Sequence, residues 1–273
     1  MSNILLIVEG STSEPKYLEQ FIKYHNIQMQ KNGNQTSTII IESYGTLIYD
    51  LYNKISNKLT DEEFETIPVL IEILRGKNIQ YDSRLNDYDQ FSNVFLFFDL
   101  DAHYYHKRNN RNEIICSKLT ALTTFFNEST DKGKLLISYP MFEALKCFKD
   151  EFMNESEVLL HLFSVYEVKS KSSRTTFKNK TKYLTSEKYN TPVFSIEKIE
   201  KLTQYFVHCA YFIINNKLDI ANSQTIFENQ FEKFIKPSNQ AVILSAFPQF
   251  IVDIFGVLPY FDDSQKRYNC KEI

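Results

Sequence analysis

Acidic residues follow two separate apolar runs of this sequence, and their placement is the first indication of chemistry. Residues 4–8 (ILLIV) end at Glu9, and residues 94–98 (VFLFF) end at Asp99-Leu100-Asp101. Alternate residues of an extended chain point to the same side, so we expect Asp99 and Asp101 to face one point. Like charges so close disfavour ionisation unless a cation lies between them, and Mg²⁺ prefers such oxygen ligands. The pattern predicts a divalent cation site, whose alternative is an acidic turn after a strand.

The elements around these acids predict where they meet. Unbroken apolar runs are typical of strands buried on both faces of a mainly parallel sheet. Ser11 and Glu14 have the spacing of a helix capping box, which predicts a helix directly after Glu9. Ligands of open α/β sheets bind at the carboxyl edge of the strands, where Glu9 and Asp99 should lie. Alternatively, Glu9 only complements the positive end of that helix.

Further candidate ligands and cations lie close to these acids in the sequence. Glu143 follows a short strand predicted at residues 135–137, so it either joins the acidic site or complements a helix that begins at Pro140. His103 and His106 could extend a metal site, although a polar loop needs no ligand to explain them. The adjacent cations are better placed to contact phosphates, and they are Lys107, Arg108 and Arg111.

A second basic stretch covers residues 168–183 and contains no acidic residue. Its cations are Lys169, Lys171, Arg174, Lys178, Lys180 and Lys182. Such a stretch can neutralise several phosphates of a nucleic acid, with salt-sensitive binding, or it is a solvated loop. Lys134, or a residue of this stretch, is a candidate to neutralise charge that develops in a transition state.

Composition narrows the class of protein. The chain has 273 residues, 43% of them hydrophobic, and a net charge of −3, so nucleic-acid contacts must be local rather than global. Its six glycines are too widely spaced for a P-loop or a dinucleotide fingerprint. The four cysteines form no CxxC pair, and no apolar run approaches the ~20 residues of a membrane span, which predicts a cytoplasmic protein.

The fold expected from these patterns is α/β. A mainly parallel sheet of about four strands, flanked by helices on both faces, should occupy residues 1–150. Residues 151–273 are predicted to be a helical C-terminal region, with helices over residues 155–166, 196–214, 223–235 and 241–258. His208 lies on an apolar helix face and is expected to be a core residue.

The order of these motifs resembles that of the Toprim domain, in which Glu-Gly follows a first strand and Asp-x-Asp a later one. Residues 8–18 (VEGSTSEPKYL) and 134–145 (KLLISYPMFEAL) resemble elements of RloB-like proteins, and similar Toprim proteins occur in phage defence of the PARIS and abortive-infection types. The resemblance covers roughly residues 1–150.

This resemblance implies a Toprim-type nuclease that uses Mg²⁺ or Mn²⁺ and acts beside a partner ATPase in anti-phage defence. Glu9, Asp99 and Asp101 would be its catalytic and metal-binding residues, with Glu14 and Glu143 as further metal ligands. The substrate would be RNA, such as tRNA, or DNA. No counterpart of a catalytic lysine is recognisable, which leaves open a non-catalytic module that docks on an ATPase or senses a phage component.

Overall fold

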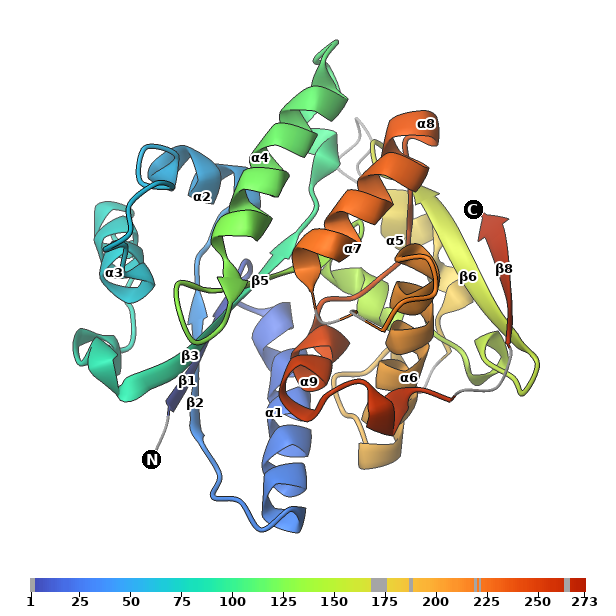
Figure 1. Cartoon of the computed structure of the whole chain (residues 1–273), viewed down its shortest axis with the longest axis horizontal. Helices are drawn as coiled ribbons and strands as arrows, with labels where there is room; N and C mark the ends of the chain where they lie inside the picture. The colour runs from blue at the N-terminus through green and yellow to red at the C-terminus, as the bar shows by residue number, and fades with distance from the viewer. Residues whose placement is uncertain (1–2, 168–175, 187–188, 219, 221, 263–265) are drawn as a thin grey trace.

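The computed structural model describes residues 3–167, 176–186, 189–218, 220, 222–262 and 266–273. It is an α/β structure with two separate sheets (Figure 1). Lys169, Lys171 and Arg174, which were predicted to bind nucleic acid, lie outside the described residues. None of the described helices combines the length and the apolar character that a membrane crossing requires.

The first sheet has the strand order β2-β1-β3-β5-β4. Its strands are β1 (Asn3–Val8), β2 (Thr38–Ser43), β3 (Phe91–Asp99), β4 (Asn127–Glu128) and β5 (Gly133–Ser138). The four longer strands are parallel to one another, and the two-residue β4 pairs antiparallel to β5. The sheet is therefore mainly parallel, as the unbroken apolar runs predicted, and it has five strands where about four were expected.

The register of these strands brings their carboxyl ends to one edge. Val8 of β1 lies opposite Ser43 of β2 and Phe97 of β3, while Asp99 lies opposite Ser138 of β5. The residues that follow β1 and β3 therefore emerge side by side, although the two strands are far apart in the chain. This edge carries the predicted acidic residues.

Helices cover both faces of the first sheet (Figure 1). On one face lie α1 (Ser13–Lys31) and α9 (Phe247–Phe255), and on the other lie α2 (Ile48–Ile55), α3 (Thr66–Gly76) and α4 (Arg111–Phe125). Alternate aromatic rings of β3 point to opposite faces. Phe97 packs at 5.4 Å from Phe247 of α9, and Phe98 packs at 5.4 Å from Tyr44. Burial on both faces explains why β3 tolerates an unbroken apolar run.

The C-terminal part is not purely helical, so this prediction was wrong. A second sheet has the order β7-β6-β8. Its strands are β6 (Glu157–Ser164), β7 (Gln240–Val242) and β8 (Arg267–Glu272), and its helices include α5 (Thr176–Lys180), α6 (Ile196–Ile213), α7 (Ser223–Gln230) and α8 (Lys236–Ser238). Residues 155–166 were predicted to be a helix. The prediction was wrong because a short apolar segment fits the periodicity of a helix and that of a strand equally well. Burial nearly alternates along β6, as expected for a strand with one covered face. His208 is a buried residue of α6, as predicted.

Contacts cross the predicted boundary at residue 150. Tyr139 and Leu244 exchange two backbone hydrogen bonds of 2.7 and 3.0 Å, which connect the end of β5 to the segment before α9. Because α9 also packs on β3, the core of the first sheet is completed by residues from the C-terminal part.

Candidate metal centre

Glu9 lies at the end of β1, where the chain turns toward α1. Its Oε2 accepts a hydrogen bond of 3.3 Å from the backbone N–H of Asp99. The turn is fixed to the neighbouring strand, because the Glu9 carbonyl accepts from the Gly45 N–H and the Gly10 carbonyl accepts from Ser43 Oγ. The prediction that Glu9 and Asp99 meet at one sheet edge is therefore confirmed.

Asp99 and Asp101 lie close together, but the backbone between them is not extended as predicted. Strand β3 ends at Asp99, and Asp101 adopts a left-handed conformation with φ +45°. The alternation of an extended chain therefore does not apply to Asp101, and that part of the prediction was wrong. An aspartate tolerates this conformation better than most residues do. Both carboxylates are nevertheless buried, with 9% and 3% of the residue exposed.

The turn between these aspartates is supported by buried hydrogen bonds. Leu100 donates its N–H to the Ser138 carbonyl of β5, and its own carbonyl accepts from the Tyr49 hydroxyl of α2 at 2.8 Å. Tyr49 was not identified from the sequence as part of the site. Its position is set by packing of α2 on the sheet, which leaves no local sequence signal.

Removing the Tyr49 hydroxyl should therefore loosen the aspartate turn. Tyr49→Phe leaves the buried Leu100 carbonyl without this donor, which should lower the free energy of unfolding by about 1–2 kcal/mol. Urea unfolding measures the change. Tyr105→Phe is the matched control, because among the described residues the Tyr105 hydroxyl makes no hydrogen bond, although its ring packs 4.8 Å from Tyr49. Equal stability losses in both variants would contradict a role for the Tyr49 bond.

Glu14 reaches back toward the same edge from the first turn of α1. The predicted capping box is absent: α1 begins at Ser13, and its N-cap Thr12 makes no side-chain cap. Instead, Glu14 Oε1 accepts from the Gly10 N–H at 3.1 Å. Gly10 also leaves room for the carboxylate, because a Cβ there would lie 2.8 Å from Glu14 Oε1. Burial raises the pKa of Glu14 from 4.5 to about 7, and Glu143 and Asp101 add to the effect.

Glu143 joins the edge from beyond β5. It lies on the 3-10 helix η4 (Phe142–Lys146), where the sequence predicted a longer helix, and 8% of the residue is exposed. Lys178 Nζ of α5 is 2.5 Å from Glu143 Oε1. A cation of the predicted basic stretch therefore contacts the acidic edge directly.

These acids act on one another as a single electrostatic cluster. The pKa of Asp99 is raised well above its ordinary value, first by burial and then by Glu9, Asp101, Glu14 and Glu143. We call these five residues the carboxylate cluster. They come from three separate segments of the chain, which the parallel strands bring to one edge. Like charges gathered out of water are costly, and a bound cation would relieve that cost.

The oxygen atoms of the cluster are suitable ligands for a divalent cation, but their present arrangement is not that of a metal site. Carboxylate oxygens, partly dehydrated and mutually repelling, are the ligands that Mg²⁺ and Mn²⁺ prefer. However, across the described ranges no group of three or more His, Cys, Asp or Glu residues is arranged so that it could hold a metal ion. Ligation would therefore need side-chain rearrangement within the cluster.

The two histidines after β3 differ in their surroundings. His103 Nδ1 lies 3.4 Å from Asp101 Oδ1, so its ring borders the cluster. The His106 ring instead contacts the His103 carbonyl through Nδ1 at 2.7 Å, and the residue is exposed. The pair therefore does not form a joint ligand set with the aspartates.

The remaining basic residues fall into three settings. Lys107 and Arg108 are exposed in the segment that follows the aspartates. Arg111 begins α4 and stacks on Tyr166, with Cζ 3.8 Å from the ring centre. Lys180 pairs with Glu167 at 2.9 Å, while Lys182 is exposed.

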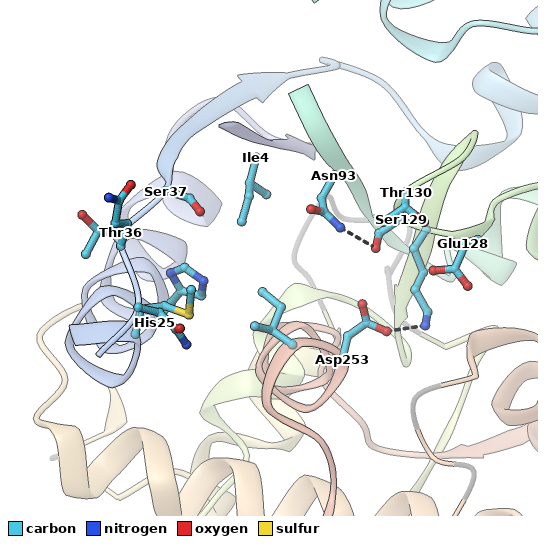
Figure 2. Close-up of a pocket in the computed structure, with 14 residues that line it drawn as sticks. Ile4, His25, Thr36, Ser37, Asn93, Glu128, Ser129, Thr130 and Asp253 are labelled. Atoms are coloured by element: carbon cyan, nitrogen blue, oxygen red, sulfur yellow. Dashed lines mark hydrogen bonds and ion pairs between the residues drawn. The ribbon is translucent and has the colours of Figure 1, made fainter. Parts of the chain in front are cut away.

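Lys134 is far from the carboxylate cluster, which corrects its proposed role in charge neutralisation there. It lies opposite Phe95 near the start of β5, whereas Asp99 lies opposite Ser138 at the end. Four residues along a strand span about 13 Å. Lys134 instead forms a buried ion pair with Asp253 of α9. This pair borders a polar cavity of about 770 Å³ at the amino edge of the sheet (Figure 2).

Comparison of the chain with models of known families, with curated proteins and with solved structures finds no match.

Proposed function

We propose that this protein is a nuclease that hydrolyses phosphodiester bonds of RNA or DNA with Mg²⁺ or Mn²⁺. The observation that carries the proposal is the carboxylate cluster, in which Asp99 is buried among four other acids at the carboxyl edge of a mainly parallel sheet. Strongly perturbed carboxylates at such an edge mark candidate functional sites. The resemblance of the motifs around Glu9 and Asp99 to those of Toprim domains supports the same activity.

The residues would divide their roles by position. Glu9, Asp99 and Asp101 would hold the metal, with Glu14 and Glu143 as further ligands. A bound divalent cation supplies an activated water and stabilises the charge of the attacking and leaving oxygens. Glu9 is held by the Asp99 N–H and is the alternative general base. Lys178, 2.5 Å from Glu143, would attract the substrate phosphate toward otherwise repelling acids.

The biological setting rests on the motifs that resemble RloB-like and other phage-defence Toprim proteins. We place the nuclease in such a system, as an effector that acts on nucleic acid beside a partner ATPase. The six glycines of the chain are too widely spaced to form a P-loop, so the partner would hydrolyse ATP.

One observation favours a second candidate, a non-catalytic module that docks on an ATPase. As described, the cluster includes no set of three residues arranged to hold a metal ion. A protein that only docks would need the fold but not the metal.

Titration of Mn²⁺ by calorimetry separates the two candidates. The nuclease should bind Mn²⁺, and Asp99→Ala should weaken binding by at least about 10-fold, the smaller end of what even outer-shell changes cost at metal sites. Asp89→Ala is the matched control, since this exposed aspartate precedes β3 at the opposite edge. Cleavage of RNA and DNA oligonucleotides in Mn²⁺ should follow the same ranking. Absence of binding by the unmodified protein, or equal binding by Asp99→Ala, would favour the docking module.

A further inference from the structure

A pocket of about 390 Å³ adjoins the carboxylate cluster at Glu143. Its walls come from η4, from α5 and from the segment that follows α5. Lys146, Lys178 and Lys182 line it together with Glu143. Three lysines against one carboxylate give the pocket an excess of positive charge, although the whole chain carries −3. This local sign is opposite to that of the neighbouring cluster.

Two of these lysines have no carboxylate partner among the residues that the structure describes. Lys178 pairs with Glu143, but among the described residues no carboxylate lies within ion-pair distance of Lys146 or Lys182. Lys146 Nζ lies over the ring of Tyr17 of α1, 5.0 Å from the ring centre. Both ammonium groups thus remain able to bind an anion.

The pocket also offers neutral hydrogen-bond donors. Thr185 and Ser186 line it, and Ser186 Oγ is buried yet makes no hydrogen bond to any of the described residues. Burial of an unsatisfied hydroxyl is unfavourable. Lysines and hydroxyls around one concave site are the usual ligands of a phosphate group.

We propose that this pocket binds one phosphate group of the substrate strand, next to the carboxylates that act on a neighbouring bond. That the phosphate belongs to the substrate rests on the proposed nuclease function. A volume of about 390 Å³ suits a single nucleotide, since small-molecule pockets run from about 300 to 1,000 Å³.

The pocket also answers an electrostatic difficulty of the cluster. A nucleic acid strand is polyanionic, and five clustered acids repel it wherever metal charge is incomplete. The pocket lysines, which lie next to the cluster, would bind the strand and hold it at this edge of the sheet. Binding at the pocket should therefore depend on salt and persist without divalent cations.

Calorimetry with adenosine 5′-monophosphate and adenosine, in EDTA and at low salt, tests the pocket without metal. The monophosphate should bind about 10-fold more tightly than the nucleoside, which is the gain expected from one charge-assisted hydrogen bond. Lys146→Ala and Lys182→Ala should each remove most of that gain. Lys180→Ala is the matched control, because Lys180 lies on the same helix as Lys178 but pairs with Glu167 outside the pocket.

The outcomes separate the pocket from the nuclease proposal. Equal affinity for monophosphate and nucleoside, or a gain that survives both lysine changes, would overturn the pocket whatever the metal titration shows. A lysine-dependent gain in a protein that binds no Mn²⁺ would keep the phosphate pocket and refute the nuclease. Asp99→Ala should leave monophosphate binding in EDTA intact, because the aspartate does not line the pocket.

Discussion

Asp99→Asn should stabilise the metal-free protein at about pH 8 and abolish its stabilisation by Mn²⁺. Burial and the neighbouring acids raise the pKa of Asp99, so the folded state binds this proton more tightly than the unfolded state does. Above the unfolded pKa, the cost of ionising Asp99 in the folded state therefore lowers the free energy of unfolding. Asparagine removes that charge while keeping the shape of the side chain. We expect a gain of roughly 1–3 kcal/mol in the free energy of unfolding, typical of a poorly compensated buried polar group.

Urea unfolding with and without Mn²⁺ measures both effects. The gain should vanish near pH 3, below the unfolded pKa of about 3.9, because both states then carry a protonated aspartate. Mn²⁺ should stabilise the unmodified protein, since it binds only the folded state, but not the variant. Asp89→Asn, at an exposed position, should change neither quantity. A less stable metal-free variant at about pH 8 would identify Asp99 as a structural residue and weaken the nuclease proposal.

Glu14→Gln should flatten the pH dependence of stability between about pH 4.5 and pH 8. The pKa of Glu14 is raised from 4.5 to about 7 in the folded protein, chiefly by burial. Within this window the folded state holds a proton that the unfolded state has released, so stability falls as pH rises. The full loss from this group is at most about 3 kcal/mol. Glutamine keeps an oxygen that can accept from the Gly10 N–H, so the bond seen at 3.1 Å can persist.

The measurement is the free energy of unfolding across that pH range, in EDTA. The unmodified protein and Glu14→Gln should have similar stability near pH 4.5 and diverge above it, with the variant more stable. Glu19→Gln is the matched control, because Glu19 is exposed on the same helix. Parallel curves for the unmodified protein and Glu14→Gln would show that Glu14 is not held in its protonated form by the fold.

The strands of the first sheet could be predicted because burial on both faces leaves an unbroken apolar run, as in β1 and β3. The second sheet could not. β6 carries apolar residues that fit a helix as well as a strand, β7 has three residues, and β8 is mostly polar and exposed. Such strands are defined by their partners, and partners are not visible in local sequence.

The site divides in the same way. The meeting of Glu9 and Asp99 follows from parallel strands ending at one edge, which the sequence pattern implies. Asp101 instead adopts a left-handed conformation, next to Leu100, whose hydrogen bonds go to Tyr49 and Ser138, two residues that are distant in the sequence. Lys134 lies at the start of β5, before the apolar residues of the strand, whereas the acidic edge lies at the strand's end. Its distance from the acidic residues could therefore have been predicted from the direction of the strand.

The packing of α9 on β3 bears on how the protein is made. A ribosome releases the N-terminal strands first, yet the face that contains Phe95 and Phe97 is covered by Phe250 and Phe247 of α9. The ion pair of Lys134 likewise cannot form until Asp253, 119 residues further along the chain, has been synthesised. Until α9 emerges, the nascent sheet presents an aromatic surface to solvent and to other chains. The core of the first sheet should therefore be completed only after α9 has been synthesised, with chaperone demand concentrated on that face.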